Sequence, residues 1–301
     1  MNNNDNIERY SLPRRIWRVI YPVLIFLGMQ FVVVIIASVV IGIVYGMREI
    51  VGGTGILDSA TLFDELLMIV TDYSMHILLG SNIINLAVFI PMWLKTRKQQ
   101  DQYVNDRPVT IGLLIAGFFA GFNIVLVMLI GLTDVLRFFP SYEEHMGLVT
   151  GGAIIIQILS VGIAAPVVEE LVFRGILLGR MKHLPVWASV LIQAILFGVV
   201  HLNTFQIIYA FIVGVLFGLV YIKFRSIVMV IIGHIAFNLI GVLVAEFVPE
   251  NFIWAVVVVC VAAVIVCAVF AIKRPRAIKT TMTGIGEWEP GATGDGGATP
   301  F

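Results

Sequence analysis

Charged residues are scarce in this chain. Lys, Arg, Asp and Glu make up only 13% of its 301 residues, and the 19 basic side chains are matched by 19 acidic ones. With 59% hydrophobic residues and a mean hydropathy of +1.01, the chain is far more apolar than an average soluble domain. This composition predicts a polytopic membrane protein, for which we expect no nucleic-acid partner.

Cysteine is nearly absent as well. The two cysteines, Cys260 and Cys267, lie seven residues apart in one predicted helix, which separates their Cα atoms by about 10 Å along the helix axis. A disulfide needs Cα atoms closer than about 7 Å. We therefore predict no disulfide between them and interpret both as small core residues of that helix.

Long apolar runs are what the chain has in abundance. About 20 apolar residues cross a hydrocarbon core of about 30 Å as a helix, and runs that are continuously apolar favour helices over a β-barrel. The sequence predicts eight spans, at residues 17–45, 74–94, 110–132, 150–179, 186–203, 205–222, 227–247 and 251–272. The predicted fold class is all-α, a transmembrane helical bundle of about eight spans.

Basic residues mark one face of this predicted bundle. When the chain is threaded with its N-terminus in the cytoplasm, sixteen of the 19 Lys and Arg residues fall on the cytoplasmic side, as the positive-inside rule requires. Only Arg48 and Arg137 fall on the opposite side, and Arg174 lies within a span. We predict an integral protein of the plasma membrane with both termini in the cytoplasm. The first run is too long for a cleavable signal peptide, so we expect it to be retained.

Little of the chain is predicted to lie outside the membrane. Residues 1–16 are a cytoplasmic segment, 17–149 the first helices and loops, 150–272 a second set of transmembrane helices, and 273–301 a cytoplasmic tail. The Gly- and Thr-rich tail is predicted to be disordered, because it cannot bury a core. A short extracytoplasmic helix is expected around residues 60–70. We find no internal repeat, which weakens a solute-carrier interpretation without excluding it.

The stretch APVVEELVFRGIL, residues 165–177, places two carboxylates and a guanidinium within an apolar span. An ionisable group inside a membrane costs at least a few kcal/mol, so such groups usually mark function. Glu170 and Arg174 are four residues apart and can pair on one helix face, whereas Glu169 points about 100° away. Pro166 is expected to kink the helix. The pair can be structural or functional, while Glu169, with no local partner, indicates a site.

Two other predicted spans supply polar partners for these carboxylates. FGVVH places Phe197 and His201 four residues apart, and HIAFN does the same for His234 and Asn238, so each pair shares a helix face. A single membrane histidine is more often a satisfied core group than a catalyst. At 1.5 Å per residue, however, Glu170, His234 and His201 lie about 15, 12 and 22 Å from the cytoplasmic helix ends. We predict that these groups meet in a cavity open to the cytoplasm.

Five further polar residues lie within predicted spans. They are Asn82, Asn85, Asn123, Gln157 and Gln193. Because none has an ionisable companion, we interpret all five as hydrogen-bonding groups between helices.

The motifs EELVFRG, FGVVH and HIAFN, in this order, resemble the EExxxR, FxxxH and HxxxN motifs of the CAAX-protease and bacteriocin-processing family, also called the Abi family. Its members are intramembrane endopeptidases related to the Ras-converting CAAX endopeptidase. The resemblance covers residues 150–245, about a third of the chain, and the ordered triplet is far more specific than one EExxxR alone. It implies a membrane-embedded protease with a peptide or membrane-protein substrate. Family roles include peptide maturation and self-immunity to bacteriocins.

The resemblance also implies a set of site residues. They are Glu169, Glu170, Arg174, His201, His234 and Asn238. In the family scheme, Glu169 and His201 would activate a water molecule, and His234 and Asn238 would donate hydrogen bonds to the oxyanion. The ion pair of the first motif would orient the site.

The participation of a metal ion is left open by these residues. Two histidines and a glutamate with an open fourth position match a catalytic zinc site, and the candidate ligands are Glu169, Glu170, His201 and His234. The same groups match a metal-free glutamate base, and the zinc motif HExxH is absent. We favour catalysis without a cofactor over a Zn²⁺ enzyme, although the family is often described as metalloproteases.

Two other function classes remain open at this point. A non-enzymatic membrane immunity or scaffold protein would bind a partner through the same core, and a solute carrier would use it for transport. The intact motifs favour the enzyme, because a protein that only binds has little reason to keep buried charges. The chain ends in GATPF, without a C-terminal Cys box, so we do not expect it to be its own CAAX substrate.

Overall fold

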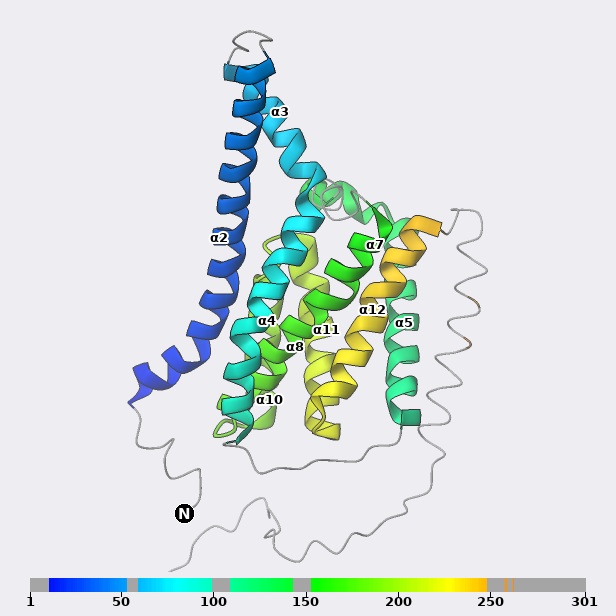
Figure 1. Cartoon of the computed structure of the whole chain (residues 1–301). Helices are drawn as coiled ribbons and strands as arrows, with labels where there is room; N and C mark the ends of the chain where they lie inside the picture. The colour runs from blue at the N-terminus through cyan, green and yellow to red at the C-terminus, as the bar shows by residue number, and fades with distance from the viewer. Residues whose placement is uncertain are drawn as a thin grey trace, which may run out of the picture.

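The computed structural model describes residues 11–52, 59–98, 109–142 and 153–247, together with Val258 and Ala262. Helices run up and down as a bundle, and no strand occurs within these described ranges (Figure 1). The predicted all-α fold class is confirmed. Because several of the helices are long and apolar enough to cross a membrane, the chain is an integral membrane protein.

Long helices precede the motif segment, and three more follow it. The preceding elements are α2 (Leu12–Gly52), α3 (Ser59–Asp72), α4 (Ser74–Lys98), α5 (Val109–Leu132) and the 3₁₀ turn η1 (Asp134–Phe138). The motif segment is one rod made of α7 (Ile154–Gln157), η2 (Ile158–Ala164), α8 (Ala165–Glu170), η3 (Leu171–Leu177) and α9 (Leu178–Arg180). It is followed by α10 (Val186–Val199), α11 (Thr204–Phe224) and α12 (Ile227–Phe247).

Six of the predicted spans are helices of membrane-crossing length and hydropathy. They are Leu12–Arg48, Ser74–Arg97, Ile111–Gly131, Ile154–Arg180, Thr204–Phe224 and Ile227–Val244. The helix of the span predicted at 186–203 is shorter, because α10 has only 14 residues and rises about 21 Å. The span predicted at 251–272 lies outside the described residues, apart from Val258 and Ala262. The short helix expected around 60–70 is confirmed as α3.

A tight turn ends α10 before residue 203. Leu202 has a φ of 58°, a left-handed conformation that an α-helix cannot continue through. The side chain of Asn203 then accepts a hydrogen bond from the Gln206 backbone N–H at 3.2 Å and caps α11, as asparagine commonly does. His201, predicted on the helix itself, therefore lies in this turn, where its own N–H donates to the Gly198 carbonyl at 3.1 Å.

Two π-helical segments, η2 and η3, flank the part of the rod that carries both glutamates. A π turn contains an extra residue and is frequent at functional sites. Segment η2 ends directly before α8, whose second residue is Pro166. Because proline has no N–H to donate, the regular helical pattern gives way in the turn before it. The disturbance predicted at Pro166 takes the form of this widened turn.

The motif rod lies at the centre of the bundle. Val168, Phe173 and Ile176 are completely buried. The Phe173 ring makes edge contacts with Phe26 of α2 and Phe197 of α10, at centroid distances of 6.3 and 5.2 Å, while α4 and α12 pack along other sides of the rod. Since lipid is as apolar as these side chains, close packing rather than exclusion of water holds such helices together. The glutamates are thus fixed in a rigid interior.

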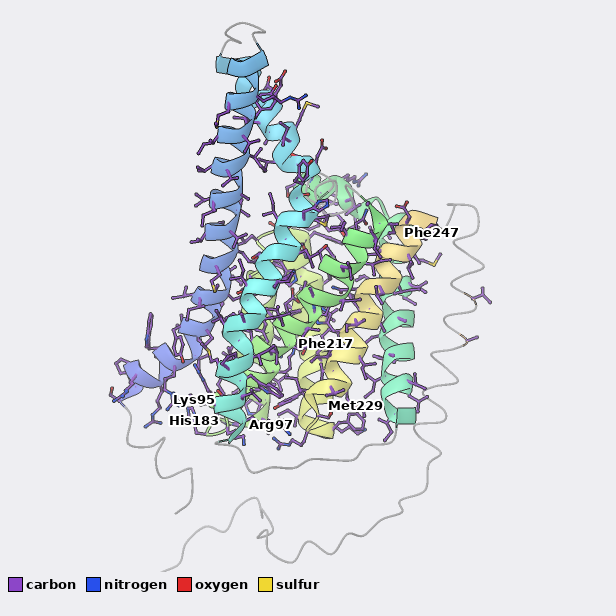
Figure 2. The ribbon with its side chains drawn as sticks, viewed as in Figure 1. Lys95, Arg97, His183, Phe217, Met229 and Phe247 are labelled. Atoms are coloured by element: carbon purple, nitrogen blue, oxygen red, sulfur yellow. The ribbon has the colours of Figure 1, made fainter. Side chains whose placement is uncertain are left out.

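Most charged residues outside the rod lie toward one end of the bundle or the other according to their sign. Lys95, Arg97 and His183 lie at one end, where α12 begins near Met229, and Phe247 lies at the other (Figure 2). Acidic residues outside the motif belong to α2, α3, η1 and the end of α12, and within the described ranges they are Glu49, Asp64, Glu65, Asp72, Asp134 and Glu246. All of them lie toward the end that Phe247 marks (Figures 1 and 2). The basic end is the one that the sequence assigns to the cytoplasm.

We expect the basic end to face the cytoplasm, because Lys and Arg are retained on the inner side of the membrane during insertion. Alkaline phosphatase fused after Lys279 should be inactive, and green fluorescent protein fused there should be bright. The control is the same pair of fusions after Gly52, at the opposite end of α2, where the phosphatase should be active. An active phosphatase after Lys279 would contradict a membrane topology with both termini inside.

Candidate functional site

Glu170 and Arg174 form a completely buried ion pair. Arg174 Nη1 donates to Glu170 Oε1 at 2.8 Å, and both side chains are 0% exposed. The guanidinium carbon lies 4.4 Å from the Phe197 ring centroid and 5.2 Å from that of Phe217, and Nη2 donates to the Gly214 carbonyl at 3.2 Å. Buried charges persist only with such partners. The pairing expected from the four-residue spacing is present, and it anchors the site.

His234 connects this ion pair to the second carboxylate. Its Nδ1 lies 2.7 Å from Glu170 Oε1, and its Nε2 lies 3.6 Å from Glu169 Oε2. The rings of Phe197 and Phe217 pack against the imidazole at centroid distances of 5.9 and 4.6 Å, which restricts its rotation. The first and third motifs therefore meet, although His234 and Glu170 are 64 residues apart in sequence.

The two glutamates have different surroundings. Glu170 Oε1 accepts hydrogen bonds from both Arg174 and His234, and the side chain has no exposed surface. Glu169 keeps 15% of its side chain exposed, and its 3.6 Å separation from the imidazole exceeds a direct hydrogen bond. Catalytic hydrogen bonds are often this long before substrate binds. Glu170 is thus buried and held through Oε1, with no hydrogen-bond partner for Oε2 among the described residues, whereas Glu169 is a carboxylate that a water molecule can reach.

The hydrogen bonds define which ring nitrogens carry protons. A carboxylate oxygen that already pairs with a guanidinium acts as an acceptor, so His234 Nδ1 donates to Glu170. A carbonyl oxygen can only accept, so His201 Nδ1 donates to the Phe197 carbonyl at 2.7 Å. A neutral His201 therefore has its lone pair on Nε2, where it can accept a proton.

His201 lies near the other motif residues. It is within electrostatic range of both Glu169 and His234, and its ring meets that of Phe197 edge-on at a centroid distance of 5.1 Å. Phe197 thus contacts His201, His234 and Arg174 at once. The sequence showed only that Phe197 shares a motif with His201. Its place at the junction of three motif side chains became visible in the structure.

Asn238 is placed differently from the other candidates. Its Nδ2 donates to the Val161 carbonyl at 2.9 Å and so links α12 to η2. A π turn disturbs the regular pairing of helical carbonyls, which offers an acceptor to a donor on a neighbouring helix. The amide group has a second N–H, and the role of Asn238 at the oxyanion stays a prediction.

Gln193 and Gly214 support the ion pair from α10 and α11. Gln193 Nε2 donates to the Gly214 carbonyl at 2.8 Å, and the same carbonyl accepts from Arg174. The interpretation of Gln193 as a hydrogen-bonding group between helices is confirmed. A Cβ atom on Gly214 would lie 3.1 Å from Phe197 Cδ1, so the close approach of the two helices there favours glycine. A backbone carbonyl gives no signal in the sequence, which is why this support was missed.

Two of the other intramembrane amides behave differently from each other. Asn82 Nδ2 donates to the Ser160 carbonyl on the motif rod at 3.4 Å, as predicted for a bond between helices. Asn85 donates to the Ser81 carbonyl at 3.0 Å, one turn back in its own helix. The prediction that Asn85 forms a hydrogen bond between helices is wrong for this bond, because a short amide side chain readily reaches the carbonyl four residues before it in the same helix.

The candidate metal ligands are largely engaged with other groups. Glu170 Oε1 accepts a hydrogen bond from His234 Nδ1, and the Phe197 carbonyl accepts one from His201 Nδ1. Among the described residues, which include all four candidate ligands, no three His, Cys, Asp or Glu side chains converge as metal binding requires. A catalytic zinc site uses three protein ligands around one point. The side chains as placed do not surround one such point, and because the Nε2 atoms of both histidines stay open in the described part of the chain, catalysis without a metal stays a prediction.

A family model described as Rce1-like, type II CAAX prenyl endopeptidase, matches residues 151–240. The matched segment contains all three motifs and every candidate site residue from Glu169 to Asn238. No curated protein matches the chain, and no solved structure matches it either. The segment that the motifs single out is therefore the one that the family model recognises.

Proposed function

Because the motif segment, residues 151–240, belongs to the Rce1-like family of type II CAAX prenyl endopeptidases, we propose that the protein is an intramembrane endopeptidase. It would hydrolyse a peptide bond of a peptide or membrane protein in the half of the plasma membrane nearest its basic, cytoplasmic end. The observation that carries this proposal is the position of His234 between Glu170, which is buried and paired with Arg174, and the accessible Glu169.

We assign the activation of water to Glu169 and His201. Attack on an amide carbonyl requires a water molecule that loses a proton as its oxygen bonds to the carbonyl carbon. The Glu169 carboxylate and His201 Nε2 are both acceptors within electrostatic range of each other, so one water molecule could donate to both. The proton taken by Glu169 then passes to the nitrogen of the leaving amine as the C–N bond breaks, which restores the carboxylate.

We assign stabilisation of the oxyanion to His234 and Asn238. Donation from His234 to the oxyanion would require a proton on Nε2 as well as on Nδ1. Glu170 holds Nδ1–H, so Nε2–H would point to the side of Glu169. Donors that are fixed in advance need no reorganisation when negative charge develops. The second amide N–H of Asn238 would complete the pair.

Activity should survive exhaustive removal of metal ions, because Glu169 and His201 supply the base. Purified full-length protein in detergent, treated with EDTA or phenanthroline, should cleave a quenched peptide at an unchanged rate, with an unchanged circular dichroism spectrum. If activity vanished on chelation and returned with Zn²⁺, the glutamate-base mechanism would be wrong and these residues would be ligands. A folded protein that cleaved no peptide of a broad quenched library would contradict the endopeptidase itself.

A further inference from the structure

Arg180, the last residue of the motif rod, ties the rod to α2. Its Nη1 donates to the Arg18 carbonyl at 2.7 Å, and its guanidinium carbon lies 4.7 Å from the Tyr21 ring centroid. A guanidinium has five N–H donors. Among the described residues, Arg180 contacts a carbonyl and a phenol but forms no ion pair with a carboxylate. The cation is thus held in place without being neutralised there.

Other cations lie around Arg180. Burial lowers the pKa of His183, and the positive charges of Arg15 and Arg18 lower it further. Arg18 also repels Arg180. The described carboxylates outside the motif belong to the opposite end of the bundle (Figures 1 and 2). The positive charge of Arg18 raises the potential at Arg180, and an anion bound to the Arg180 guanidinium would offset it.

A hollow on α2 adjoins this group of cations. It has a volume of about 360 Å³ and is lined by Trp17, Tyr21, Leu24 and Ile25. Pro22 lies within α2 at this point, and the helix bends near its N-terminal end (Figure 1), as helices do at proline. Trp17 and Leu24 are 58% and 50% exposed. The hollow therefore opens to the outer surface of the bundle, which meets lipid in a membrane.

We propose that this place binds one anionic phospholipid, with its phosphate at Arg180 and one acyl chain in the hollow of α2. Tyr21 contacts the Arg180 guanidinium and also lines the hollow. The place for the phosphate and the place for the acyl chain are therefore next to each other. A guanidinium matches a phosphate in charge and hydrogen-bond geometry, and basic pockets between transmembrane helices bind anionic headgroups. Trp17 and Tyr21 are residue types that favour the depth of the headgroups.

The bound lipid would fasten α2 to the end of the motif rod. The phosphate contacts Arg180 on the rod, while the acyl chain lies along Leu24 and Ile25 of α2. Removal of the lipid would leave the apolar packing of α2 on the rod and the contacts of Arg180 with Arg18 and Tyr21 as the links at this place. The lipid should therefore increase thermal stability, and this effect does not depend on the proposed peptidase activity.

Thermal unfolding of the full-length protein in detergent tests the proposal. Phosphatidylglycerol should raise Tm in a saturable manner, whereas phosphatidylcholine with the same acyl chains should raise it little, because its ammonium meets the same cations. In Arg180→Gln, the concentration of phosphatidylglycerol for half of the effect should increase about tenfold or more, as loss of a charge-assisted hydrogen bond implies. Arg180→Lys keeps the charge without the planar fork and should lose less.

Two controls separate this site from general attraction to basic residues. Lys95→Gln removes an exposed positive charge from the same end and should change the half-effect concentration by no more than about twofold, because one exposed charge contributes little. Leu24→Trp fills the hollow at constant charge and should weaken the lipid effect.

Three results would overturn the proposal: equal effects of the two lipids, equal losses in Arg180→Gln and Lys95→Gln, or full stabilisation by inorganic phosphate alone. If Arg180→Gln does not fold, the decision rests on Arg180→Lys and Leu24→Trp. Wild-type lipid dependence in both of these variants would then refute the site.

Discussion

Replacing Glu169 by glutamine is expected to lower kcat/KM by about two to four orders of magnitude, the usual reach of general base catalysis. Glutamine keeps the shape of the side chain but cannot take a proton from water. Because Glu169 is 15% exposed and lies 3.6 Å from His234, its loss breaks no short hydrogen bond between helices. Tm and yield in detergent should stay close to those of the wild type, while turnover of a quenched peptide falls.

The matched control for this variant is Glu246→Gln, which removes an exposed carboxylate near the end of α12, the helix that carries His234. It should change neither turnover nor Tm. If Glu169→Gln turned over at the wild-type rate, Glu169 would not be the base, and a non-enzymatic scaffold would become the better account of the motif residues.

Glu170→Gln should lower the free energy of unfolding by about 3–5 kcal/mol, the typical cost of removing one partner from a buried ion pair. Glu170 Oε1 accepts from Arg174 at 2.8 Å and from His234 at 2.7 Å, and the side chains of Glu170 and Arg174 have no exposed surface. Glutamine would leave the guanidinium uncompensated inside the membrane. We expect a low yield of soluble protein in detergent and a lower Tm.

Adding Arg174→Leu to Glu170→Gln should recover part of the yield and of the Tm, because the uncompensated charge is then gone. Activity should stay low, since His234 no longer has the carboxylate that fixes its Nδ1–H. Stability that returns without activity would identify Glu170 as a positioning residue. A Glu170→Gln protein as stable as the wild type would show that this ion pair does not hold the fold together.

Most of the helical bundle could be predicted from the sequence for one physical reason. In lipid every backbone N–H and C=O must be satisfied within the span, so a long apolar run has little choice but to form a helix. The end of α10 was mispredicted because residues 199–202 stay mostly apolar, while the left-handed Leu202 and the cap at Asn203 end the helix. Asn203 was the available signal. The π-helical segments carry no comparable signal except Pro166 beside η2.

The site was partly predictable from spacing. The ion pair between Glu170 and Arg174 follows from their separation of four residues on one helix, and polar residues on three spans indicated that the spans converge. Which atoms meet depends on how α12 packs on the rod, so the contact of His234 with Glu170 could not be specified. The support from Gln193 through the Gly214 carbonyl was invisible, because a backbone group has no residue type.

The peptides of cells that make the wild-type protein or Glu169→Gln at equal levels test the endopeptidase most directly, because the comparison requires no prior choice of substrate. We predict membrane or secreted peptides with new termini that occur with the wild type and are absent with Glu169→Gln. Purified wild-type protein should make the same cuts in synthetic versions of these peptides. Identical termini in both kinds of cell, with both proteins folded in the membrane, would contradict the account.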